Sequence, residues 1–76
     1  MSTLKNVPPN KNIPSNFTWG PKTIKSLRQC AGLSQSDLAN LIGVRQQTIS
    51  EWETDAYRPR GASIRMLNMV AEKYNF

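Results

Sequence analysis

Three consecutive side chains, Arg45, Gln46 and Gln47, have the chemistry needed to recognise the edges of nucleic-acid bases. A glutamine amide carries a donor and an acceptor on one planar group, so it can form paired hydrogen bonds with N6 and N7 of adenine, and an arginine can do the same with O6 and N7 of guanine. Such contacts require an element narrow enough to enter the major groove, and an α-helix is one. The surrounding sequence must therefore supply that helix and the scaffold that positions it.

A helical pattern precedes these three residues. Ser34 is a suitable N-cap, Asp37 stands three positions later as its acidic partner, and apolar residues then recur at helical intervals. We expect a helix from Gln35 to Ile42. We expect it to end at Gly43, because glycine adopts the left-handed conformation common at helix ends without a steric penalty.

A second helical pattern runs from Arg45 to Trp52. Val44 can fill the corner between the two helices, while Ile49 and Trp52, three apart, can pack back on the first helix. Ala39 is small enough to let two crossing helices approach closely. With these residues turned inward, the outward face carries Gln46, Gln47, Ser50 and Glu51.

The segment from Ser34 to Glu53 resembles the helix-turn-helix of the Cro and phage-repressor family, also called the xenobiotic-response-element type. The resemblance extends to Ile24–Arg28 before it and to Arg58–Arg60 after it. It implies an all-α fold, a compact four-helix bundle of the lambda-repressor type in residues 19–76, that binds double-stranded DNA. Two packed helices joined by a glycine turn, without DNA binding, would show a similar pattern. The residues to which we assign structural roles are Arg28, Ala39, Gly43, Val44, Ile49, Trp52 and Glu53.

The resemblance also implies an ion pair. In the family, an arginine at the position of Arg28 is typically paired with the glutamate that follows the recognition helix, which here is Glu53. We expect this pair, and the alternative is two unconnected surface charges, which contribute little to stability. The family usually has glycine two residues after that glutamate. Here Asp55 takes the place, a tolerable change because aspartate enters the left-handed region more readily than most residues.

By resemblance, the helix from Arg45 to Trp52 enters the major groove with its N-terminal end leading. The expected base contacts are Arg45, Gln46, Gln47, Ser50 and Glu51. The expected phosphate contacts are Ser34, Gln35, Thr48, Tyr57, Arg58 and Arg60. Arg45 could reach either guanine or a phosphate, and the Glu51 carboxylate would be repelled by phosphates unless it accepts a hydrogen bond from cytosine N4.

Composition agrees with a nucleic-acid partner and offers nothing for catalysis. The chain has 76 residues, enough for one small domain, and 10 Lys and Arg against 5 Asp and Glu give a net charge of +5. This charge suits a polyanion, although a solvated basic surface would have it too. Histidine is absent and the glycines are scattered, so we expect no enzyme activity, no metal site and no cofactor. Cys30, the single cysteine, is expected to be a small buried residue.

The segments that flank the two central helices are less distinctive. Prolines and asparagines interrupt residues 1–18, so we expect an extended or flexible arm that either follows the DNA or is a loose tail. Trp19 is expected to cover the core rather than stack on bases. A helix should begin at Pro21, with Gly20 as its cap, and end at Gly32. Its core-facing residues should be Ile24, Leu27 and Ala31.

A last helix is expected from Ala62 to Asn75. One apolar stripe comprises Ile64, Leu67, Ala71 and Tyr74. A second comprises Met66, Met69, Val70 and Lys73, and it could serve as core or as a dimer surface.

One copy of so small a domain offers few base contacts, so we expect a homodimer on a two-fold symmetric operator. The expected role is that of a transcriptional regulator, in particular a repressor. Alternatives are an antitoxin that binds a toxin protein and regulates its own operon, and a helix-turn-helix used only for protein contacts. No run of apolar residues is long enough for a signal peptide or a membrane span, so we expect a cytoplasmic, nucleoid-associated protein without membrane partners.

Overall fold

The computed structural model describes residues 17–76, which form four α-helices and, within that range, no β-strand. The helices are α1 (Pro21–Ala31), α2 (Gln35–Ile42), α3 (Gln46–Glu53) and α4 (Ala62–Lys73). The expected all-α, four-helix fold is confirmed. Most of the expected arm, residues 1–16, lies outside the described residues.

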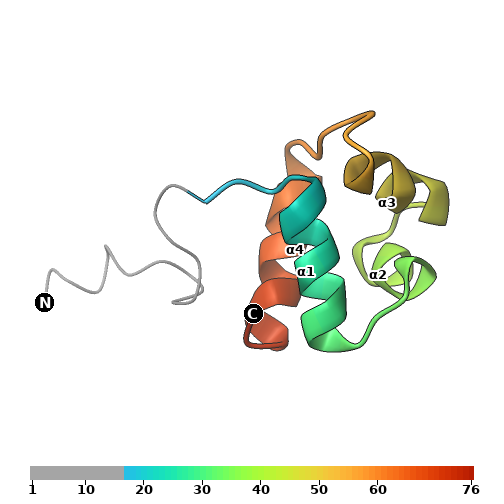
Figure 1. The fold of residues 1–76 in the computed structure, drawn as a ribbon. Helices are drawn as coiled ribbons and strands as arrows, with labels where there is room; N and C mark the ends of the chain where they lie inside the picture. The colour runs from blue at the N-terminus through green and yellow to red at the C-terminus, as the bar shows by residue number, and fades with distance from the viewer. Residues whose placement is uncertain (1–16) are drawn as a thin grey trace, which may run out of the picture.

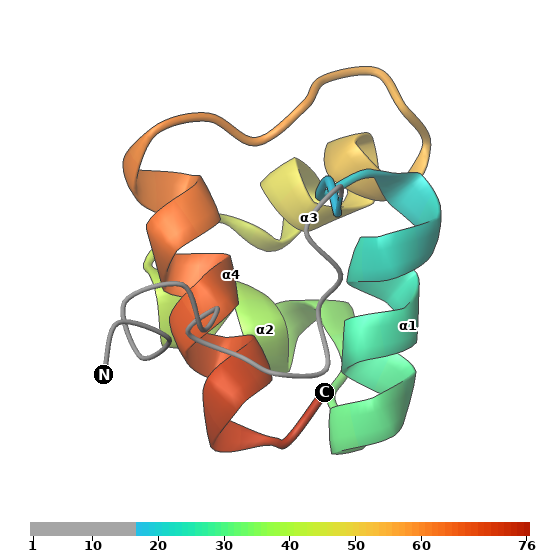
Figure 2. The same ribbon diagram turned by 90° about the vertical axis from the view of Figure 1, so that its left-hand side faces the viewer.

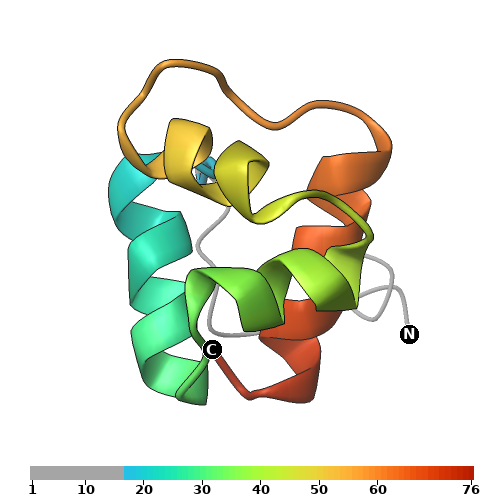
Figure 3. The same ribbon diagram turned by 90° about the vertical axis from the view of Figure 1, so that its right-hand side faces the viewer.

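The helices form two layers. α1 and α4 run in nearly the same direction at the two sides of the molecule, and α2 and α3 lie across the space between them (Figure 1, Figure 3). The layers are joined by contacts of α1 with α3 and of α2 with α4, and α2 and α3 also pack on each other. Seen from the opposite side, residues 17–20 lead into the upper end of α1 (Figure 2).

Local hydrogen bonds explain where α2 begins and ends. The Ser34 hydroxyl oxygen accepts from the backbone N–H of Asp37 at 3.0 Å, and the Asp37 carboxylate accepts from the backbone N–H of Ser34 at 3.0 Å. This reciprocal capping box satisfies two backbone donors that the helix itself cannot pair. At the other end Gly43 has φ 80°, the left-handed conformation expected of it, and its N–H donates to the carbonyl oxygen of Ala39 at 2.8 Å.

Three helix ends differ from the sequence-based expectation. Arg45 has extended backbone angles, φ −81° and ψ 153°, so it is the N-cap of α3 rather than its first residue, and α3 ends at Glu53 instead of Trp52. The last helix stops at Lys73 instead of Asn75, because Asn75 turns to φ 62° and the chain leaves the helix there.

The core is formed by apolar residues from all four helices. Each of these residues is less than a tenth exposed, and they are Ile24, Leu27, Leu38, Ala39, Ile42, Ile49, Trp52, Leu67, Val70 and Ala71. Val44 is half-buried and packs against this cluster, in the corner between α2 and α3. The corner that the sequence predicts is therefore built as expected.

Trp19 joins the two ends of the described chain. Its indole is buried, and its Nε1 donates to the Oδ1 of Asn68 on α4 at 2.7 Å. Its ring stacks on Phe76 with 5.9 Å between centroids and meets Phe17 edge-on at 4.7 Å. The expectation that Trp19 covers the core is confirmed, with a polar anchor for the indole N–H.

Three burial expectations were wrong in whole or in part. Cys30 is exposed rather than buried, because each residue of a helix is rotated by about 100° from the last and position 30 falls off the stripe set by Ile24 and Leu27. Ala31, at the end of α1, is only half-buried. Ile64, in the first turn of α4, is 37% exposed.

The second stripe of α4 divides between core and surface. Val70 is buried and Met66 is packed against the core, whereas Met69 is 60% exposed and Lys73 is exposed. The stripe is therefore neither wholly core nor wholly free. Its outer part leaves an apolar surface on α4.

Candidate nucleic-acid interface

The first turn of α3 presents polar side chains to solvent. Arg45, Gln46 and Gln47 are exposed, while Ile49 and Trp52 on the opposite side of the helix are buried with 0% and 4% of their surface accessible. This division fixes the rotation of α3 about its axis, because turning the helix would pull Ile49 and Trp52 out of the core. The residues further along the outward face are half-buried: Thr48, Ser50 and Glu51.

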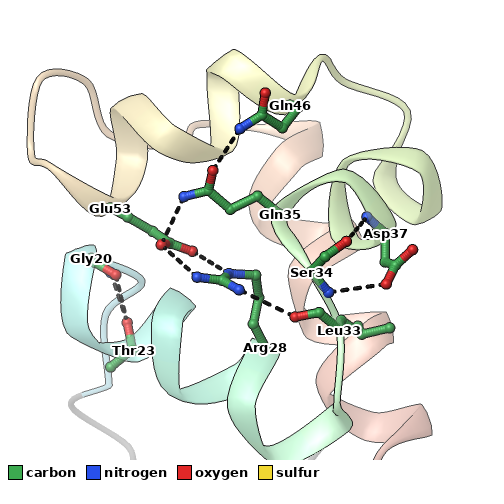
Figure 4. Close-up of polar contacts among 9 residues, drawn as sticks. All are labelled: Gly20, Thr23, Arg28, Leu33, Ser34, Gln35, Asp37, Gln46 and Glu53. Atoms are coloured by element: carbon green, nitrogen blue, oxygen red, sulfur yellow. Dashed lines mark hydrogen bonds and ion pairs between the residues drawn. The ribbon is translucent and has the colours of Figure 1, made fainter.

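Gln46 is held by the start of α2. Its Nε2 donates to the Oε1 of Gln35 at 2.6 Å, and the Nε2 of Gln35 donates in turn to the Oε1 of Glu53 at 3.1 Å (Figure 4). The carboxylate can only accept, so it sets the orientation of the Gln35 amide. The Gln35 oxygen is thereby directed at Gln46. A buried acid at the end of α3 thus orders a side chain at the beginning of the same helix.

The ion pair expected between Arg28 and Glu53 anchors this chain of hydrogen bonds. Arg28 Nε donates to Glu53 Oε2 at 2.6 Å and Nη2 donates to Oε1 at 2.9 Å, which is the bidentate geometry that a guanidinium makes best (Figure 4). Arg28 Nη1 also donates to the carbonyl oxygen of Leu33 at 3.2 Å. The pair therefore joins α1, the α1–α2 turn and α3.

The environment of this pair affects both ionisations. Burial by itself raises the pKa of the Glu53 carboxyl, but hydrogen bonds from Arg28 and Gln35 and the nearby charges of Arg28 and Lys25 outweigh it, so the pKa lies below its ordinary value. The hydrogen bond with Glu53 raises the pKa of Arg28. Both groups are thus held in their charged forms.

The α3–α4 loop holds the remaining cationic candidates. Asp55 has φ 65°, as expected for the residue standing where the family usually has glycine, and the N–H of Ala56 donates to the carbonyl oxygen of Glu51 at 2.9 Å. Tyr57, Arg58 and Arg60 are exposed on this loop. Arg58 Nε donates to Asp55 Oδ1 at 2.9 Å, and both side chains are more than half exposed, so this pair is open to exchange with a phosphate.

The structure brings some of the site residues together and leaves others apart. Ser34 and Gln35 at the start of α2 lie beside the start of α3, where Gln35 contacts Gln46. Tyr57, Arg58 and Arg60 form a separate group on the loop, where the Arg58 side chain bonds to Asp55 of the same loop and not to the α3 face. The two groups would contact different parts of a ligand.

Sequence reasoning missed the bonds that order the site. Gln35 was expected only as a phosphate contact, yet it connects Glu53 to Gln46. Gln47 Nε2 also donates to Glu51 Oε2 at 3.3 Å, a contact that their spacing of one helical turn could have indicated. No local pattern could have indicated the Gln35 bonds, because its partners are far away in the chain.

Comparison with known proteins assigns the family. The helix-turn-helix family model, of the Cro and phage-repressor type, matches residues 24–75, which is more than half of the chain. The chain belongs to this family. It is accordingly a DNA-binding regulator of transcription, and the family is not typically enzymatic. No curated protein matches the sequence significantly.

Residues 17–76 contain neither a group of metal-binding side chains nor a helix that could span a membrane. No three His, Cys, Asp or Glu side chains in this part of the chain are grouped so that they could bind a metal ion. None of its four helices is long and apolar enough to cross a membrane.

Proposed function

We propose that this protein binds double-stranded DNA in a sequence-specific manner and represses transcription by occupying promoter DNA. The observation that carries the proposal is the exposure of Gln46 and Gln47 on the leading turn of a helix whose other side is locked into the core by Ile49 and Trp52. An exposed N-terminal turn with paired donors and acceptors is what a recognition helix requires.

In this mode α3 enters the major groove and Gln46 meets an adenine. One N–H of the Gln46 amide is donated to Gln35, but the amide keeps a second N–H and its oxygen for N7 and N6 of the base. The bond to Gln35 reduces the conformational freedom that Gln46 loses on binding, which favours affinity. Arg45, at the N-cap, reaches a guanine or a phosphate beside that base.

Phosphate contacts position the domain on either side of α3. On one side, the Gln35 amide and the Ser34 hydroxyl lie at the N-terminal end of α2, which is the positive end of its dipole. On the other side lie Arg58 and Arg60 of the exposed loop. Thr48 and Tyr57 complete these contacts in our proposal.

We further propose a homodimer, with half-sites about 34 Å apart, because one domain alone makes too few base contacts for a specific site. The outer part of the second stripe of α4, the exposed Met69 and the half-buried Met66 one turn before it, supplies apolar surface for the dimer. The antitoxin alternative would use the same surface for a toxin, and a stable complex with a second protein from the same operon would favour it.

The test compares glutamines at two places. Gln47→Ala should weaken binding to a duplex selected from a random pool by about 1–3 kcal/mol and relax the preference at one base pair. Gln29→Ala, which removes an exposed glutamine of α1, is the matched control and should leave binding unchanged. Equal losses on all sequences for the Gln47 variant would contradict base reading by α3.

A parallel comparison tests the phosphate contacts. Arg58→Ala should weaken binding to every duplex and reduce the salt dependence, the slope of log K against log salt, by about one. Arg65→Ala, which removes an exposed arginine of α4, is its control. A sequence-dependent loss for Arg58→Ala would instead assign this side chain to base recognition.

A further inference from the structure

Glu51 is an acid on the face that meets DNA in the proposed function. It is half-buried on α3, and none of the ion pairs formed within residues 17–76 involves it. Its carboxylate oxygen Oε2 instead accepts from Gln47 Nε2 at 3.3 Å. An uncompensated carboxylate near phosphates lowers affinity for DNA in general. It therefore reduces binding to every sequence that does not offer it a hydrogen-bond donor.

The contact with Glu51 restricts how Gln47 can read a base. A free glutamine amide can present an oxygen and an N–H to adenine, or both N–H groups to the two acceptors O6 and N7 of guanine. With one N–H directed at the carboxylate, only one N–H and the oxygen remain for the base. The guanine mode is thereby lost and the adenine mode is kept.

The second carboxylate oxygen of Glu51 remains available. It can only accept, so it fits the exocyclic amine N4 of cytosine and is repelled by O4 of thymine and by O6 and N7 of guanine. Adenine offers an amine but places the acceptor N7 next to it, which makes cytosine the better partner.

We infer that Gln47 and Glu51 act as one unit that selects adenine opposite Gln47 and cytosine opposite Glu51. The two residues are four apart on α3, a rise of about 6 Å, and bases on one strand are about 3.4 Å apart, so the two bases are neighbours or separated by one base. This inference rests on the proposed function and deepens it, because it names the base types that the site recognises.

The test is a selection of duplexes from a random pool by the full chain and by Glu51→Gln, with Glu72→Gln as control. Glu72 is an exposed acid of α4, so both variants change the net charge equally. The wild type and Glu72→Gln should enrich an adenine and, within two base steps, a cytosine. Glu51→Gln should lose the cytosine preference, because an amide can donate as well as accept.

Binding to single duplexes gives the magnitude. Replacing the selected cytosine by thymine should weaken wild-type binding by about tenfold, and Glu51→Gln should bind both duplexes within about twofold of each other. Glu51→Gln should also bind unselected duplex DNA more tightly than Glu72→Gln, because it removes a charge from the binding face itself.

The outcomes separate the inference from the proposed function. If the wild type enriches a sequence and Glu51→Gln enriches the same sequence with the same cytosine preference, the inference is wrong while sequence-specific binding stands. A guanine or thymine opposite Gln47 or Glu51 in the wild-type site would also overturn it. If the wild type enriches no sequence, the proposed function fails, and this inference fails with it. Circular dichroism melting of each variant verifies that it is folded.

Discussion

Replacing Glu53 by glutamine should destabilise the fold although it removes no volume. The Glu53 side chain is 4% exposed and accepts from both Arg28 and Gln35, so the neutral amide leaves the Arg28 charge without a counterion. Breaking a fully buried pair costs about 3–5 kcal/mol, but the Arg28 side chain is 16% exposed and can regain some hydration. We expect a loss of about 2 kcal/mol, which lowers Tm by about 8–16 °C for a domain of this size.

A double-mutant cycle measures the pair itself. The free energy of unfolding is determined by urea denaturation for the wild type, Glu53→Gln, Arg28→Met and the double variant. Because the bidentate geometry joins α1 to α3, we expect a coupling energy of at least about 1 kcal/mol, more than an exposed pair provides. Glu72→Gln, an exposed acid of α4, is the control and should change stability little. A coupling energy below about 0.3 kcal/mol would refute the reasoning.

The same variant has a defined pH dependence. The pKa of Glu53 in the folded protein lies below its ordinary value, so its contribution is fully present above that ordinary value, about 4.3, and is lost as pH falls through the lower folded value. The difference in Tm between wild type and Glu53→Gln should therefore shrink below about pH 4. Asp37, whose pKa is lowered by hydrogen bonds with Ser34, affects both proteins alike. A difference that is constant down to pH 2 would contradict this assignment.

Three further changes test the scaffold and the site. Gly43→Ala should lower the free energy of unfolding by about 1–2 kcal/mol, because a residue with a β-carbon is strained at φ 80° even though no atom lies within 4 Å of the place of that carbon. An unchanged Tm would show that the turn adapts. Trp19→Phe should cost about 1–3 kcal/mol because Asn68 loses its buried donor, and combining it with Asn68→Leu should recover part of that loss. Gln35→Ala should reduce the difference in binding free energy between the preferred base and other bases opposite Gln46 more than it reduces the free energy of unfolding. A loss of folding stability alone would show that the bond between the two glutamines is only structural.

Local sequence rules predicted most of the helix ends correctly. The Ser34 and Asp37 capping box and the left-handed Gly43 depend on residues within one turn, and these are the features that the structure shows where expected. Burial was harder to predict at the ends of helices. Ile64 lies in the first turn of α4, where the partner elements no longer cover every side, and it is more exposed than its periodicity indicated.

The sequence by itself determined the four helices, the glycine turn between the second and third, and the face on which Gln46 and Gln47 stand, because helical period, caps and turn residues act over a few positions. Only the tertiary structure decided how these side chains are held. Glu53 reaches Gln46 through Gln35, and Trp19 reaches Asn68 and Phe76, across distances along the chain that no local pattern encodes. Such contacts exist only after the helices have packed. The burial of Ile49 and Trp52 sets the rotation of α3, and this rotation decides which residues the surface side chains of α3 contact.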